Sequence, residues 1–193
     1  MRLLISRFVI IFFAALMIPF ASAQEATAKS ATPAPAVKPA LGPAQCLLVM
    51  WNDVGRRLTA MAEDFPEEKY DFKPSPVQRS FAEQLIHAAK GNYIFLDIAK
   101  GVKPQYADPK RSEFKNKAAV VEYVRQSFAD GAALIASKGD SGINDLVVDP
   151  SNQFYSINEE AWAIVEHSGE HYGQLVVYYR VAGLVPPESR PKK

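Results

Sequence analysis

The chain has 193 residues, 48% of them hydrophobic, which is enough for one ordinary domain with a core of its own. With 22 basic and 21 acidic residues, its formal net charge of +1 leaves no basic footprint, so we expect no nucleic-acid partner. Cys46 is the single cysteine, which excludes an internal disulfide, and packing alone must therefore hold the fold.

The first 23 residues are typical of a secretory signal peptide. Arg2 and Arg7 give a positive start, residues 8–20 are almost wholly apolar, and residues 21–23 (Ala-Ser-Ala) fit a cleavage site. An uncleaved anchor is the less favoured alternative, because a membrane span needs about 20 apolar residues. We therefore expect an exported protein, periplasmic or extracellular, with no membrane span after signal cleavage.

Composition divides the rest of the chain into three parts. Residues 24–44 are rich in Ala and Pro and have almost no large apolar side chain, which predicts a disordered linker. Residues 45–187 carry regular apolar periodicity and are predicted to be the folded domain. Residues 188–193 are predicted to be a flexible tail.

Apolar residues recur at three- and four-residue intervals in four segments of this domain, a pattern typical of amphipathic helices. The segments are residues 46–65, 80–100, 118–136 and 158–181. Each is followed by a proline or a glycine that favours helix termination. With no repeated strand signal and one short extended piece at residues 146–148, the pattern predicts an all-α four-helix bundle.

The three histidines of the chain fall on two of these helices. His167 and His171 are four residues apart, so they lie on one face of the fourth helix, with Tyr178 the aromatic residue best placed to reach the same cavity. His87 lies on the second helix, where Gly91, one turn further on, leaves space beside its imidazole for a ligand or a metal. Three neutral imidazoles could hold one metal ion and leave a position for water or substrate, as catalytic sites do.

A structural role for these histidines is the alternative, because capping and core hydrogen bonds explain many histidine pairs at this spacing. The metal is favoured because a buried pair would otherwise need several polar partners in an apolar face. Glu83 could orient His87 from one turn away, although a capping box with Ser80 explains Glu83 equally well. Glu166 and Glu170 point away from the ligand face, so we expect solvated or ion-pairing roles for them.

Six motifs carry a resemblance to a known family. They are residues 51–54 (WNDV), 70–74 (YDFKP), 79–87 (RSFAEQLIH), 166–175 (EHSGEHYGQL), 179–180 (YR) and 183–187 (GLVPP). In this order they resemble the DinB-like (DinB/YfiT-type) family of metal-dependent four-helix-bundle proteins, over essentially the whole domain.

The resemblance implies an up-down-down-up bundle with one divalent ion. The ion is held by one histidine of the second helix and two of the fourth, which correspond here to His87, His167 and His171. We expect zinc, and nickel, iron, copper or cobalt also suit imidazole ligands. The resemblance further implies a homodimer as the assembly.

Two functions remain open on these grounds. One is a metal-dependent hydrolase or a thiol or group transferase, acting on a small molecule that the sequence does not identify. No catalytic side chain stands out, because no phosphate cradle, Ser-His-Asp order or thiolate nucleophile accompanies the histidines. The alternative is a non-catalytic helical module that binds a metal or a small ligand and acts through dimerisation.

Overall fold

A computed structural model of the protein describes residues 40–149 and 151–191. Four long helices account for most of them: α1 (Pro43–Asp64), α2 (Phe81–Ala99), α3 (Lys117–Gly142) and α4 (Ile157–Val181). Two short antiparallel strands, β1 (Leu146–Val148) and β2 (Phe154–Ser156), connect α3 to α4. Single turns of 3₁₀ helix occur at Glu67–Lys69, Arg111–Glu113 and Pro187–Ser189. The predicted all-α four-helix class is confirmed.

The predicted signal peptide (residues 1–23) and the predicted linker as far as residue 39 lie outside the described residues. Within the described part of the chain, no helix combines the length and the apolar character that a membrane crossing requires.

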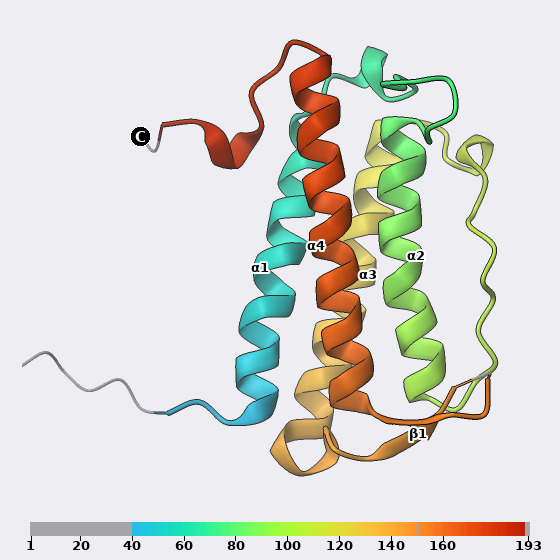
Figure 1. Cartoon of the computed structure of the whole chain (residues 1–193), viewed down its shortest axis with the longest axis vertical. Coiled ribbons are helices and arrows are strands. Elements are labelled where there is room, and N and C mark those ends of the chain that lie inside the picture. Colours follow the sequence, from blue (N-terminus) through green and yellow to red (C-terminus); the bar gives the residue numbers. More distant parts are fainter. Residues whose placement is uncertain (1–39, 150, 192–193) are drawn as a thin grey trace, which may run out of the picture. The chain divides into compact units, whose positions relative to one another are not determined.

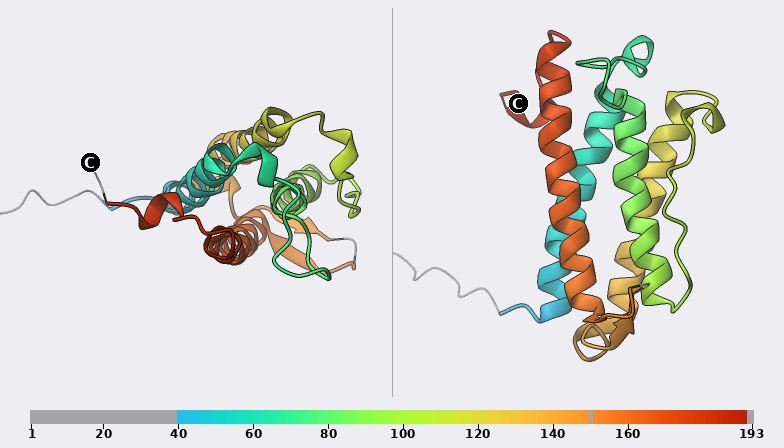
Figure 2. Two further views of the ribbon diagram at one scale, coloured as in Figure 1. Left: turned by 90° about the horizontal axis from the view of Figure 1, so that it is seen from above. Right: turned by 45° about the vertical axis from the view of Figure 1, so that its right-hand side comes forward.

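The helices run up, down, down and up, as the resemblance implied (Figure 1 and Figure 2). Residues 65–80 join α1 to α2 at one end, and the long connection of residues 100–116 returns beside α2 to that same end before α3 descends. Both α1 and α2 pack mainly against α3 and α4, so α1 and α2 are diagonal neighbours. This arrangement places α2 beside α4, and these are the two helices that carry the histidines.

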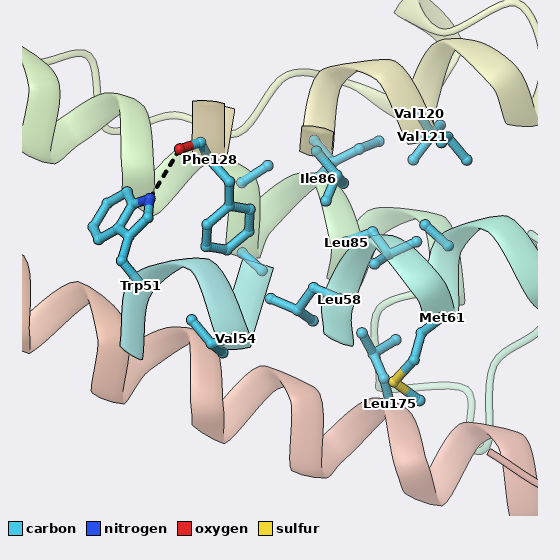
Figure 3. Packing of buried hydrophobic residues seen from close by; sticks show 14 of the residues in the cluster. Trp51, Val54, Leu58, Met61, Leu85, Ile86, Val120, Val121, Phe128 and Leu175 are labelled. Atoms are coloured by element: carbon cyan, nitrogen blue, oxygen red, sulfur yellow. Dashed lines mark hydrogen bonds between the residues drawn. The ribbon is translucent and has the colours of Figure 1, made fainter. Parts of the chain in front are cut away.

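The core lies between the apolar faces of the four helices (Figure 3). On α1, Trp51, Leu58 and Met61 are fully buried at helical spacing. The Trp51 indole N–H donates to the carbonyl of Phe128 at 2.9 Å, which satisfies its polar group inside the core. Gly131 allows the close approach of α3, since a Cβ there would lie 2.0 Å from Trp51 Cζ2.

Capping boxes fix the starts of both histidine-bearing helices. At α2, the Glu83 backbone N–H donates to the Ser80 hydroxyl, and the Ser80 N–H donates to the Glu83 carboxylate at 2.6 Å. This capping box was predicted from the sequence. Ser156 and Glu159 make the same pair of bonds at α4. The two boxes satisfy N–H groups that would otherwise lack partners and set where each helix begins.

The connection from α3 to α4 differs in detail from the prediction. The third helical segment, predicted over residues 118–136 and to end at the glycine that follows it, continues to Gly142, with a non-helical φ of 59° at that glycine, Gly139. Glycine adopts positive φ without strain, so the chain bends there instead of leaving the helix. The extended piece at residues 146–148 is confirmed as β1, whereas its partner β2 was not predicted.

The described part of the predicted flexible tail (residues 188–193) lies against α1. Arg56 donates to the Glu188 carboxylate at 2.6 Å, and Arg190 donates to both carboxylate oxygens of Asp64 at 2.8 and 2.5 Å. These four side chains are partly exposed, so solvent screens both ion pairs and each contributes little to stability.

Candidate metal centre

The three histidines converge between α2 and α4. One ring nitrogen from each of His87, His167 and His171 lies within 4.8 Å of the other two. The Nε2 atoms of His167 and His171 are 3.0 Å apart. Two imidazole nitrogens bound to one tetrahedral zinc at 2.0–2.1 Å would be about 3.3 Å apart, so this pair stands close to that separation. The structure thus brings together all three residues that the sequence predicts as ligands.

Gly91 makes the approach of His167 to α2 possible. A Cβ at Gly91 would lie 2.8 Å from Cε1 and 2.9 Å from Nδ1 of His167. Gly91 does leave space on α2, as predicted, but that space does not hold a ligand or a metal. The His167 ring fills that space, because α4 presents it to α2 at the level of Gly91.

Asp108 holds the imidazole of His87. Its two carboxylate oxygens lie 3.0 and 2.9 Å from His87 Nδ1. A carboxylate at this nitrogen keeps the ring proton there and leaves the Nε2 lone pair for a ligand. The sequence suggested Glu83 for this role, but the Glu83 carboxylate accepts from the α2 cap and lies 3.6 Å from Lys73 Nζ.

Local sequence patterns do not identify Asp108. It lies 21 residues after His87, in a connection without secondary structure at that point, and no local spacing relates the two. The only available signal is that a long polar connection must run back along α2, which brings its carboxylates near the histidine.

Two glutamines hold His171 from the other side. Buried Gln84 of α2 places Nε2 against both His171 Nδ1 and Gln174 Oε1, and Gln174 Oε1 also lies 3.2 Å from His171 Nδ1. With the ring proton on Nδ1, Gln174 Oε1 accepts both this proton and the Gln84 N–H, and Gln84 does not donate to Nδ1; Nε2 of His171 is then unprotonated toward His167. No local sequence pattern relates either glutamine to His171.

Burial favours the neutral form of the histidines on α4. Burial, followed by the charges of His171 and His87, lowers the pKa of His167 to about 4. Burial also lowers the pKa of His171, against the opposing effect of its hydrogen bond to Gln174. Neutral imidazole is the form that binds metal ions, so the donor set suits a cation at neutral pH.

The remaining predicted residues take simpler positions. Glu166 and Glu170 are exposed on α4, in agreement with solvated roles. Tyr178 is buried, and its hydroxyl donates to the Arg79 carbonyl at 2.7 Å. This bond ties α4 to the segment before α2.

Two hollows open to solvent flank the histidine cluster. The first, of about 430 Å³, is bordered by Asp108 and residues 76–79. The second, of about 650 Å³, is bordered by Gln84, Gln174 and residues 77–79, with Tyr178. Each hollow thus reaches a side chain that holds a histidine, and a small molecule in either would lie near the cluster.

The sequence profile of the DinB superfamily matches residues 50–175, about two-thirds of the chain. This protein belongs to the DinB superfamily. The matched range contains His87, His167 and His171. A search of curated proteins finds no match.

Several solved structures are similar to this chain. A DinB-like protein from Bacillus cereus is 15% identical, with a TM-score of 0.62 over 74% of this chain and 95% of that one. The DinB-like protein YjoA from Bacillus subtilis is 16% identical, with a TM-score of 0.61 over 76% and 99%. YfiT from Bacillus subtilis, described as a probable metal-dependent hydrolase with an unusual four-helix bundle topology, is 13% identical, with a TM-score of 0.61 over 78% and 94%. At these identities, the likeness shows the fold.

Proposed function

We propose that this protein binds one divalent metal ion through His87, His167 and His171. The observation that carries the proposal is the convergence of three imidazoles within 4.8 Å. A hydrogen bond between His167 and His171 alone would account for their separation of 3.0 Å. It would not account for the presence of His87 beside this pair. Nor would it account for the Asp108 carboxylate that lies 2.9 Å from His87 Nδ1.

We propose further that the ion serves hydrolysis or group transfer on a small molecule. His87, His167 and His171 would hold the ion and leave one coordination position open, where a bound divalent ion would polarise a substrate carbonyl or activate water or a thiol. Within the chain, Asp108 orients His87, while Gln84 and Gln174 orient His171. The flanking hollows have room for a small substrate. The description of YfiT as a probable metal-dependent hydrolase supports the same chemistry.

Zinc is the ion that we propose. Neutral imidazoles in a tetrahedral arrangement suit zinc, and three histidines are a known donor set for catalytic zinc. Nickel, iron, copper and cobalt also accept imidazole nitrogen, so the metal found in purified protein decides among them.

Metal analysis of untagged protein tests the binding proposal. We expect about one ion per chain, lost in His171→Ala and retained in the control Glu170→Ala, which changes an exposed neighbour on the same helix. Zinc added to metal-stripped protein should raise the melting temperature of the unsubstituted chain and of the control, but not of His171→Ala. Absence of stoichiometric metal together with no zinc-induced stabilisation would contradict the proposal.

A substrate panel separates the catalytic role from the non-catalytic alternative. Metal-loaded protein is assayed for turnover of esters, of amides, and of electrophiles in the presence of a thiol donor. Turnover that disappears in His171→Ala supports catalysis. Stabilisation by metal without turnover of any compound favours a module that binds metal for structure.

We also propose that the protein acts outside the cytoplasm. The support is the signal-like sequence of residues 1–23. N-terminal sequencing of protein recovered from cell fractions tests this, with Gln24 expected as the first residue of the exported form. A chain that keeps Met1 and stays in the cytosol would contradict it.

A further inference from the structure

Cationic side chains gather at the first of the two hollows beside the histidines. Four cations and two carboxylates line it: Lys73, Arg79, Lys110, Arg111, Glu83 and Asp108. The lining therefore carries an excess of two positive charges. Metal binding by the histidines makes no use of these cations, so they call for another explanation.

Two of the four cations are already engaged within the protein. Arg111 donates from Nε to Asp71 Oδ1 at 2.9 Å and from Nη1 to the carbonyl of Phe114 at 2.9 Å. Lys73 Nζ lies 3.6 Å from the carboxylate of Glu83. These contacts use the charge of both side chains to hold the loops around the hollow.

Arg79 and Lys110 have donors to spare. Arg79 Nη2 lies 3.6 Å from Asp108 Oδ2, an ion pair as long as that of Lys73 with Glu83, but the Arg79 side chain is 46% exposed and makes no hydrogen bond to the described residues. The Asp108 oxygens are instead close to Nδ1 of His87, at 3.0 and 2.9 Å. Among the described residues, Lys110 has no carboxylate within ion-pair distance of its ammonium group. Five guanidinium donors and one ammonium group are therefore available at one hollow.

The backbone of Arg79 is fixed, and its side chain borders both hollows. Arg79 directly precedes Ser80, the N-cap of α2, and its carbonyl accepts the Tyr178 hydroxyl at 2.7 Å. It also lines the second hollow. Its Nη2 lies 3.6 Å from Asp108 Oδ2, and that same oxygen lies 2.9 Å from His87 Nδ1. One carboxylate therefore separates Arg79 from the histidine cluster.

We propose that Arg79, assisted by Lys110, binds an anionic group of the substrate, a carboxylate or a phosphate. The inference rests on the proposed metal function, because an anion held there would place the rest of the substrate beside the histidines. A guanidinium can present two parallel N–H donors to either group, which fixes orientation as well as position. The charge of Asp108 opposes the anion, but Asp108 also lies against His87, and Arg79 and Lys110 together carry two positive charges against its one negative charge.

Nuclear magnetic resonance on the full chain, labelled with nitrogen-15 and stripped of metal, tests the anion site. Sodium phosphate and sodium acetate are titrated separately at constant ionic strength, so the two anions distinguish a phosphate site from a carboxylate site. We expect saturable shifts of the Arg79 Nε–H signal with at least one anion. Arg79→Met should weaken binding of that anion about tenfold or more, and Arg79→Lys should weaken it less.

The matched control is Arg180→Met. Arg180 is exposed in the last turn of α4, at the same end of the bundle, and lines neither hollow. Its removal takes away one positive charge without touching the proposed site, so anion binding should change less than twofold. Well-dispersed spectra of each variant show that it is folded.

Zinc binding is measured separately in every variant, so the two proposals can fail independently. If neither anion gives saturable shifts, or Arg180→Met weakens binding as much as Arg79→Met, the anion site is wrong and the metal proposal stands. If Arg79→Met lowers zinc affinity but leaves anion binding unchanged, Arg79 only positions Asp108, and the anion site is again wrong. If unsubstituted protein fails to bind zinc, the proposed function fails, whatever the anions do.

Discussion

Replacing Gly91 by Ala should disturb the histidine cluster without removing any nitrogen donor. The new Cβ would lie 2.8 Å from Cε1 of His167, whereas ordinary contacts begin at 3.4 Å, so the imidazole or α2 must move by about 0.6 Å. Metal sites tolerate deviations of only about 0.2 Å in ligand distance. The displacement is about three times that tolerance, and we therefore expect metal binding to suffer.

Two effects on stability oppose each other in this variant. Alanine in a helix interior is favoured over glycine by about 1 kcal/mol. Crowding of a packed site costs about 1–3 kcal/mol. The metal-free protein should therefore change by no more than about 2 kcal/mol. The higher helix propensity of alanine does not strengthen metal binding, so it cannot offset the displaced imidazole. Metal affinity should therefore fall roughly 10–100-fold, the size of effect seen when the partners of metal ligands are disturbed.

Competition with a chromophoric chelator measures zinc affinity, and urea unfolding measures stability. Gly169→Ala is the matched control, because Gly169 lies on α4 between His167 and His171, and a Cβ there meets nothing within 4 Å. The control should gain up to about 1 kcal/mol of stability and keep its zinc affinity. Unchanged zinc affinity in Gly91→Ala, or equal losses in the two variants, would refute the reasoning.

Asp108→Asn should weaken zinc binding roughly 10–100-fold, because an amide holds the His87 imidazole less firmly; chelator competition measures this, and an unchanged affinity would speak against the contact. The Ser80 N–H holds the pKa of the Glu83 carboxyl below its ordinary value of 4.5, so this group stabilises the fold above about pH 4.5 and its contribution is lost as the pH falls through its lower folded-state pKa. Acid unfolding followed by circular dichroism should therefore depend less steeply on pH in Glu83→Gln, and parallel curves would contradict the assignment. Trp51→Phe leaves a buried carbonyl of α3 without its indole donor, and the free energy of unfolding in urea should fall by about 1–3 kcal/mol; a change under about 0.5 kcal/mol would show that water or a neighbour replaces the bond.

The sequence by itself determined the local elements that carry the site. Helical periodicity located the four helices, and Ser80 with Glu83 marked the start of α2. The spacing of His167 and His171 put both on one face of α4, since residues four apart lie one turn apart on any α-helix. These features depend on residues close together in the chain, so they can be predicted without knowing which helices pack against each other.

Only the tertiary structure decided what surrounds the histidines. Asp108 reaches His87 because the long connection returns along α2, and Gly91 admits His167 because α2 and α4 are adjacent. The same adjacency sets Gln84 of α2 against His171 of α4. Each contact joins segments whose separation in sequence carries no period or spacing. The reason is physical: local propensity fixes which face of a helix is apolar, whereas the packing of whole helices fixes which faces meet.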